Sequence, residues 1–129
     1  MMSDEYPKNR SPITRVLTMP SNANATGDIF GGWILAQVDI AGAILAAERA
    51  QGRIVTVAVN SVHFKKPVFV GDVVSFFCEI LKIGNTSITV LVEVFAERIP
   101  GIKDKVTEAE IVYVAVDENR KPRPVPVDR

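Results

Sequence analysis

The longest apolar stretch of the chain, GDIFGGWILAQVDIAGAILA, predicts a helix that is buried on most of its surface. The turn-forming residues SNANATGD precede it and place its start close to Gly31. Gly52 is well placed to end it near Gln51. The stretch is long enough to suggest a membrane span, but Asp39 near its centre would add about 2.5–3.5 kcal/mol on insertion scales. A core helix of a soluble protein is therefore preferred.

After the helix the spacing of apolar residues changes from helical to alternating, which predicts strands. In the first such segment Val55, Val57 and Val59 fall on one face. The Gly71-Asp72 pair and the GNTS turn separate later segments. The predicted strands cover residues 13–19, 53–64, 73–81, 88–97 and 105–116. One strand, a helix and then strands joined by short connections are typical of an α+β fold with an antiparallel sheet.

The chain of 129 residues suits one compact domain. Residues 1–12 are polar and are expected to form a flexible arm, and residues 13–129 a single domain whose KPRPVPVDR tail is too proline-rich for a strand. A helix that is apolar almost all round must be covered on both sides, and one sheet of this length covers only one side. The second cover is most simply another copy of the chain, so the sequence predicts a symmetric homodimer.

Composition excludes several classes of partner. The 15 basic and 15 acidic residues cancel, so the overall charge offers no long-range attraction for nucleic acid or an acidic membrane surface. Cys78 is the single cysteine, which permits no disulfide within the chain and no cysteine cluster for zinc. MMSDEYPKNR at the N-terminus contains acidic residues and no apolar segment, unlike a secretion signal. We therefore expect a cytoplasmic location.

Asp39 is the first candidate for chemistry, because a carboxylate in an apolar setting is costly unless it is paired or hydrogen-bonded. None of its neighbours one helical turn away can pair with a charge. These neighbours are Leu35, Ala36, Gly42 and Ala43. Two interpretations remain open: a structural carboxylate that accepts hydrogen bonds from a distant strand, or a functional one. The small residues favour the second slightly, because they leave space for a ligand.

Gly31 and Gly32 form a second candidate feature at the predicted helix start. The first N–H groups of a helix have no intrahelical partner, and glycines let a substrate carbonyl approach them as an oxyanion site requires. Tight packing of the helix on a sheet explains the glycines equally well. Gly31 and Asp39 lie about 12 Å apart along the helix, too far for one reaction centre. Antiparallel helices from two chains would bring them together, which predicts a composite site in the dimer.

The segments SNANATGDIFGGWILAQVDIAGA, RIVTVAVNSVHFKKPVFVGDVV and GNTSITVLVEVF resemble the bacterial acyl-CoA thioesterases of the hotdog fold, the broad-specificity acyl-CoA hydrolase family. The likeness covers about residues 13–125 and includes the P-x-x-x-G-D turn. It implies an α+β hotdog fold in which one long central helix is wrapped by a five- to six-stranded antiparallel sheet. It also implies cytoplasmic hydrolysis of acyl-CoA to free acid and coenzyme A by catalytic homodimers, often assembled into hexamers as trimers of dimers.

The resemblance also implies roles for single residues. Asp39 matches the helix carboxylate that acts as nucleophile or general base, and Gly31 and Gly32 match the backbone donors at the helix start. Asn24 matches a side-chain amide that helps to hold the thioester or the attacking water, although its position alone favours a turn-forming role. Some relatives have threonine or serine one turn after the carboxylate. This chain has Ala43 there, which leaves the hydrogen-bonding auxiliary unassigned.

Basic residues must meet the phosphates of coenzyme A. The candidates are Lys65 and Lys66, with Arg98, Arg120 and Lys121 behind them, and Thr86 and Ser87 for the pantetheine arm. A charge near a strand end is usually only solvated, and this is the favoured explanation for the basic residues, whereas turn chemistry explains Thr86 and Ser87 equally well.

No metal or cofactor is expected, because a thiolate leaves readily and an oxyanion hole with one carboxylate suffices. His63, the only histidine, lies on a predicted strand and is interpreted as structural or exposed. No serine lies in a G-x-S-x-G context. A non-catalytic acyl-CoA sensor using the same pocket is the main alternative, and a structural subunit that has lost its site is a weaker one. No output element is visible outside the domain, so hydrolysis is favoured.

Overall fold

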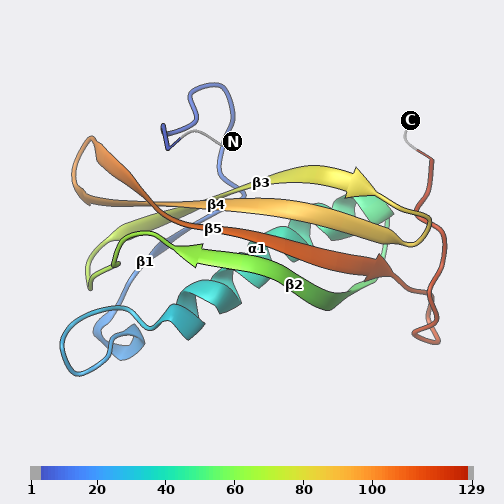
Figure 1. The fold of residues 1–129 in the computed structure, drawn as a ribbon, viewed down its shortest axis with the longest axis horizontal. Helices are drawn as coiled ribbons and strands as arrows, with labels where there is room; N and C mark the ends of the chain where they lie inside the picture. Colours follow the sequence, from blue (N-terminus) through green and yellow to red (C-terminus); the bar gives the residue numbers. More distant parts are fainter. Residues whose placement is uncertain (1–3, 128–129) are drawn as a thin grey trace.

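The computed structural model describes residues 4–127 and consists of one long helix lying across one face of a five-stranded antiparallel sheet (Figure 1). The elements are β1 (Thr14–Leu17), η1 (Pro20–Asn22), α1 (Gly31–Ala50), β2 (Ile54–Phe64), β3 (Val73–Ile83), β4 (Ser87–Ile99) and β5 (Ile102–Ala115). The strand order is β1-β3-β4-β5-β2. The predicted α+β fold is confirmed. The ends of the expected arm and tail, residues 1–3 and 128–129, lie outside the described residues.

The helix begins at Gly31 as predicted, but its last turn differs from the expectation. Gln51, and not Gly52, adopts the left-handed conformation that closes the helix, with a φ of 54°. Gly52 instead leaves room for Arg123, because a Cβ at this position would lie 2.7 Å from the guanidinium Nη2. The same Nη2 donates a 2.9 Å hydrogen bond to the carbonyl of Ala50. The C-terminal tail therefore completes the end of the helix.

The core lies between α1 and the sheet. The helix contributes Ile34, Val38, Ala41, Ala46 and Ala50. The central strands contribute alternate residues, among them Val74, Phe76, Ile88, Val90, Val92, Val94, Ala109, Ile111 and Tyr113. This alternation follows the predicted period of two, because successive side chains of a strand point to opposite faces. Each large apolar side chain that is fully buried stabilises the fold by roughly 1.5–3 kcal/mol.

The side of α1 that faces away from the sheet is uncovered in this single chain. Ile40 and Ile44 on that side are 51% and 49% exposed. The neighbouring edge strand β2 exposes Val57 and Val59 to a similar degree and pairs only with β5. By length and composition alone α1 could also span a membrane. An apolar helix face beside an open strand edge is typical of a subunit interface.

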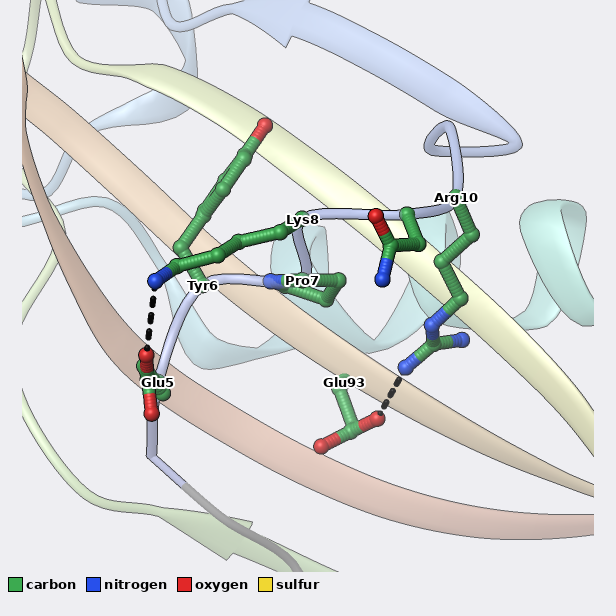
Figure 2. A pocket seen from close by; sticks show the side chains of 7 residues that line it. Glu5, Tyr6, Pro7, Lys8, Arg10 and Glu93 are labelled. Carbon is green, nitrogen blue, oxygen red and sulfur yellow. Dashed lines mark hydrogen bonds and ion pairs between the residues drawn. The ribbon is translucent and has the colours of Figure 1, made fainter.

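Residues 4–12 lie along the face of the sheet opposite the helix. Tyr6 packs edge-on against Phe77, with ring centroids 5.1 Å apart. Arg10 forms an ion pair of 2.7 Å with the buried carboxylate of Glu93. The arm and Glu93 line an open pocket of about 420 Å³. Figure 2 shows the side chains that line it. The arm therefore covers a part of the sheet that the helix does not reach.

Asp72, at the turn before β3, anchors the end of the sheet near the helix start. Its fully buried carboxylate accepts hydrogen bonds from Arg98 at 2.9 and 2.8 Å and from the N–H of Phe69 at 2.9 Å. The Arg98 guanidinium also lies 4.4 Å from the centroid of the Phe69 ring. Thr18, at the end of β1, donates to the carbonyl of Asp72 at 2.9 Å. One residue therefore connects β1, β3 and β4.

We expect Asp72→Ala to lower the free energy of unfolding by about 2–3 kcal/mol, because it leaves the Arg98 guanidinium and a backbone N–H without their acceptor. Chemical denaturation measures the change. The matched control is Lys8→Ala, which removes an exposed ion pair with Glu5 and should alter stability by less than about 0.5 kcal/mol. Equal effects of the two substitutions would contradict an anchoring role for Asp72.

Candidate active site

A groove of about 380 Å³ opens at the N-terminal end of α1. Residues that line it include Asn24, Gly31, Phe64, Lys65 and Lys66. The first helical hydrogen bonds run from the N–H groups of Trp33 and Ile34 to the carbonyl of Phe30. The N–H groups of Gly31 and Gly32 donate to no residue in the described part of the chain. Two backbone donors at the positive end of the helix are thus available to a ligand oxygen.

Asn24 shapes the loop that leads into this groove. Its Oδ1 accepts three hydrogen bonds, from the N–H and the hydroxyl of Thr26 at 3.0 and 2.9 Å and from the N–H of Asp28 at 3.1 Å. These bonds are the turn-forming role that the sequence favoured. Its Nδ2 group makes no hydrogen bond within residues 4–127, and the residue lines the groove. The two roles considered for Asn24 are therefore compatible, since they use different atoms.

Asp39 has the distant strand partner that the structural interpretation required. Its Oδ1 accepts a 2.8 Å hydrogen bond from the hydroxyl of Thr56 on β2. Oδ2 accepts no hydrogen bond of good geometry from residues 4–127, although the Tyr113 hydroxyl lies near the carboxylate, and the side chain is only half-buried. A carboxylate that is held through one oxygen and open at the other can still accept a proton or attack a carbonyl carbon. The hydrogen bond therefore positions Asp39 without excluding a chemical role.

Thr56 is a residue of the candidate site that the sequence analysis missed. The only signal was a hydroxyl on a strand face that it shares with Ile54 and Ala58. Nothing in that alternation shows that the face meets the middle of α1 at Asp39. The structure thus supplies from β2 the auxiliary hydroxyl that Ala43 cannot provide.

The expectation that Gly42 leaves space for a ligand beside Asp39 is wrong. Gly42 is buried, and a Cβ at this position would lie 3.1 Å from Cζ of Tyr113. The Tyr113 hydroxyl occupies the space and donates a 2.8 Å hydrogen bond to the main-chain carbonyl of Asp39. Burial, with a further contribution from the nearby Asp39 charge, raises the pKa of Tyr113. The phenol therefore stays protonated and acts as a donor.

A single chain does not bring the carboxylate to the helix start. Asp39 and Gly31 stand about 12 Å apart along α1, at a rise of about 1.5 Å per residue. Thr56 lies near the beginning of β2, whereas Phe64, which lines the groove, is its last residue. The carboxylate and the groove are therefore two half-sites, near opposite ends of the same edge strand.

The candidate contacts to coenzyme A fall into separate regions. Lys65 and Lys66 lie at the groove, in surface ion pairs of 3.3 and 3.4 Å with Asp4 and Asp104. Arg98 donates from two of its nitrogens to Asp72, so its main contact is structural.

Thr86 lies in the turn between β3 and β4 and Ser87 is the first residue of β4, at the end of the sheet near the C-terminus of α1 (Figure 1). Their carbonyls accept hydrogen bonds from the N–H groups of Ala115 and Gly84. Arg120 belongs to the turn after β5, where its N–H donates to the carbonyl of Asp117. Lys121 lies in the same turn. The single chain does not bring any of these residues to the groove.

The remaining chemically active side chains take no part in either half-site. His63 is exposed on β2, which agrees with its interpretation as structural or exposed. Cys78 packs against the core, and burial raises the pKa of its thiol to about 12. Among residues 4–127 no group of three or more His, Cys, Asp or Glu side chains is arranged to hold a metal ion.

Comparison with known proteins places this site in context. Residues 26–102 match the model of the thioesterase superfamily. The acyl-CoA thioester hydrolase YciA of Salmonella typhimurium is 50% identical over 119 residues, which cover 89% of this chain and 90% of that protein. A hexameric thioesterase from Yersinia pestis is 48% identical, with a TM-score of 0.89 over 95% of this chain and 100% of that chain.

An acyl-CoA hydrolase from Staphylococcus aureus, solved in complex with butyryl coenzyme A, is more distant. It is 28% identical, with a TM-score of 0.83 over 88% of this chain and 70% of that chain. The same enzyme has been solved with one aspartate and with one asparagine replaced by alanine. A hotdog-fold thioesterase of Campylobacter jejuni also matches, at 43% identity and a TM-score of 0.86 over 91% of both chains.

Asn24→Ala should lower the free energy of unfolding by about 1–2 kcal/mol, because it removes the acceptor of three turn hydrogen bonds. Asn24→Asp keeps an acceptor oxygen and should retain most of that stability. Thermal unfolding of the two variants beside the parent protein measures the difference. Equal losses would contradict the assignment of the turn contacts to the side-chain oxygen.

Proposed function

Because this chain belongs to the thioesterase superfamily, we propose that it hydrolyses acyl-CoA at sites that two subunits share, with Asp39 as the reacting carboxylate. The protein is an acyl-CoA thioester hydrolase of the hotdog fold and forms a homo-oligomer. The finer assignment of residues rests on the geometry of the two half-sites. Its single strongest support is that the carboxylate and the helix start flank one unpaired strand edge.

The open edge of β2 and the exposed side of α1 define the proposed dimer. Antiparallel pairing of two β2 strands about a two-fold axis brings the beginning of one strand beside the end of the other. Thr56 and Asp39 of one subunit then meet the groove at Phe64 and Gly31 of the other. Each dimer has two equivalent sites, and the exposed Ile40 becomes buried at the contact. We propose a hexamer as a trimer of such dimers, since close relatives are hexameric.

Hydrolysis joins water to the thioester carbonyl carbon and breaks the bond from that carbon to sulfur. The N–H groups of Gly31 and Gly32 hold the carbonyl oxygen, on which negative charge develops. Asp39 of the other subunit acts either as a base that takes a proton from water or as a nucleophile whose acyl intermediate water then cleaves. The leaving group is the thiolate of coenzyme A, which needs no strong acid. We therefore propose a reaction without metal or cofactor.

Thr56 and Asn24 complete the proposed site. The Thr56 hydroxyl holds Oδ1 of Asp39, so that Oδ2 faces the substrate or water. The free Nδ2 of Asn24 donates to the thioester oxygen or to the attacking water. In the Staphylococcus aureus hydrolase, the aspartate and asparagine replaced by alanine are separated by the same number of residues as Asp39 and Asn24. That spacing supports the pairing of the two roles.

We place the phosphates of coenzyme A at Lys65 and Lys66, because both lysines line the groove and neither is buried. Thr86 and Ser87 reach the substrate only if a neighbouring subunit brings their turn to the groove. A location in the cytoplasm fits a chain whose one cysteine has no disulfide partner within the chain.

Replacing Asp39 with asparagine should lower the rate of acyl-CoA hydrolysis at least ~10²-fold, because the amide neither accepts the proton of water nor attacks the carbonyl. The assay follows release of free thiol from acyl-CoAs of several chain lengths. Glu48→Gln changes an exposed carboxylate on the same helix and should leave the rate unchanged. Wild-type activity of Asp39→Asn would overturn the assignment. No turnover by the parent protein with any substrate would favour an acyl-CoA-binding protein.

A mixing experiment tests whether the two half-sites belong to different subunits. Gly31→Val places a side chain where the substrate carbonyl must approach, and should be inactive like Asp39→Asn. Mixed dimers of these two variants contain one intact site and one doubly defective site. Unfolding and refolding the equimolar mixture should therefore restore about a quarter of the parent activity by random pairing. A mixture as inactive as its components would show that each site lies within one chain.

A further inference from the structure

The side chain of Tyr113 on β5 reaches the turn of α1 that contains Asp39. Its side chain is fully buried in the core between helix and sheet. Its hydroxyl donates a 2.8 Å hydrogen bond to the main-chain carbonyl of Asp39. A buried phenol hydroxyl needs a hydrogen-bond partner. This one finds it in the backbone of the residue that we propose as catalytic.

Gly42 makes room for that hydroxyl. It lies one turn after Asp39 in the middle of α1, where glycine is a poorer helix former than alanine. A Cβ at Gly42 would overlap the hydroxyl oxygen of Tyr113 and would lie 3.1 Å from Cζ and 3.2 Å from Cε2 of its ring. The missing side chain on the helix and the hydroxyl on the strand are thus complementary in shape. Together they set how closely α1 approaches β5 at this level.

Thr56 and Tyr113 stand directly opposite each other in the pairing of β2 with β5. Thr56 donates to the side chain of Asp39, and Tyr113 donates to its main chain, both at 2.8 Å. One cross-strand pair therefore holds Asp39 at two points. Because the direction of a helical side chain follows its backbone, the main-chain contact also limits where the free Oδ2 can lie.

We propose that Tyr113 is a positioning residue for thioester hydrolysis, whose hydroxyl, seated against Gly42, keeps the Asp39 turn in register with Thr56. The inference rests on the proposed role of Asp39 and goes beyond it, because Tyr113 acts through the helix backbone and not on the substrate. Reacting groups must lie within a few tenths of an ångström of their productive positions, and a displacement of about 1 Å costs about 10²-fold in rate.

The test is a double-mutant cycle of Tyr113→Phe and Gly42→Ala, with kcat and KM measured on one acyl-CoA. Tyr113→Phe removes only the hydroxyl and should lower kcat about tenfold while KM changes less than about twofold. Gly42→Ala should lower kcat further, because its methyl group collides with the hydroxyl. The double variant should recover part of the loss caused by Gly42→Ala, since the overlap with the hydroxyl oxygen is gone and only the closer contacts with the ring carbons remain. Tyr6→Phe, the matched deletion at the other tyrosine, should leave kcat unchanged.

Introducing Tyr113→Phe into the Asp39→Asn variant separates a positioning role from an effect on general stability. If Tyr113 acts through the carboxylate, Tyr113→Phe leaves the residual rate of Asp39→Asn unchanged. A further tenfold loss in that background, or failure of Tyr113→Phe to fold, would contradict the inference and show a structural role only. Measuring Tyr113→Phe in the parent protein and in Asp39→Asn tests the positioning role even if Gly42→Ala does not fold.

The outcomes also distinguish this inference from the proposed function. Full activity of Asp39→Asn would overturn the proposed function itself. An inactive Asp39→Asn together with a Tyr113→Phe variant of wild-type kcat would leave the proposed function intact and overturn only the role of Tyr113.

Discussion

The structure depends on one constraint, which is that an apolar helix must be covered on both sides. The sheet covers one side of α1, where Val38 and Ala41 are completely buried. Ile40 and Ile44 on the other side remain about half exposed in the single chain. Burying that surface, together with the open edge of β2, is the physical reason for association. In the proposed dimer, assembly and catalysis are therefore linked, because the open β2 edge runs from Thr56 beside Asp39 to Phe64 at the groove.

Within this apolar setting Asp39 and Asp72 each have specific hydrogen-bond partners. Asp39 receives one hydrogen bond on its side chain from Thr56 and one on its main chain from Tyr113. The carboxylate of Asp72 is buried completely, yet it receives three hydrogen bonds. The two carboxylates differ in how many of their oxygens accept hydrogen bonds. Both oxygens of Asp72 accept hydrogen bonds, as suits an anchor, whereas Oδ2 of Asp39 stays open, as the proposed reactive role requires.

The helix start contributes a different kind of chemistry, since it needs no side chain of its own. Gly31 and Gly32 present backbone N–H groups that no described residue accepts, and the loop held by Asn24 leads into the same groove. In the proposed site, the hydrogen-bonded loop and the helix end are already in place before substrate binds. Such preorganised donors stabilise developing charge without the cost of reorientation. The proposed site would thus combine a fixed electrostatic element from one chain with a fixed carboxylate from another.

The sequence by itself determined the elements and the candidates, because periodicity and turn residues are local. The helix from Gly31 and the strands after it follow directly from apolar spacing, and Asp39 stands out since its helical neighbours cannot pair with it. Only the tertiary structure decided which distant residues meet. The Asp39–Thr56 hydrogen bond and the packing of the Tyr113 hydroxyl against Gly42 depend on how the strands pair and how the helix lies across them. No local pattern encodes that register.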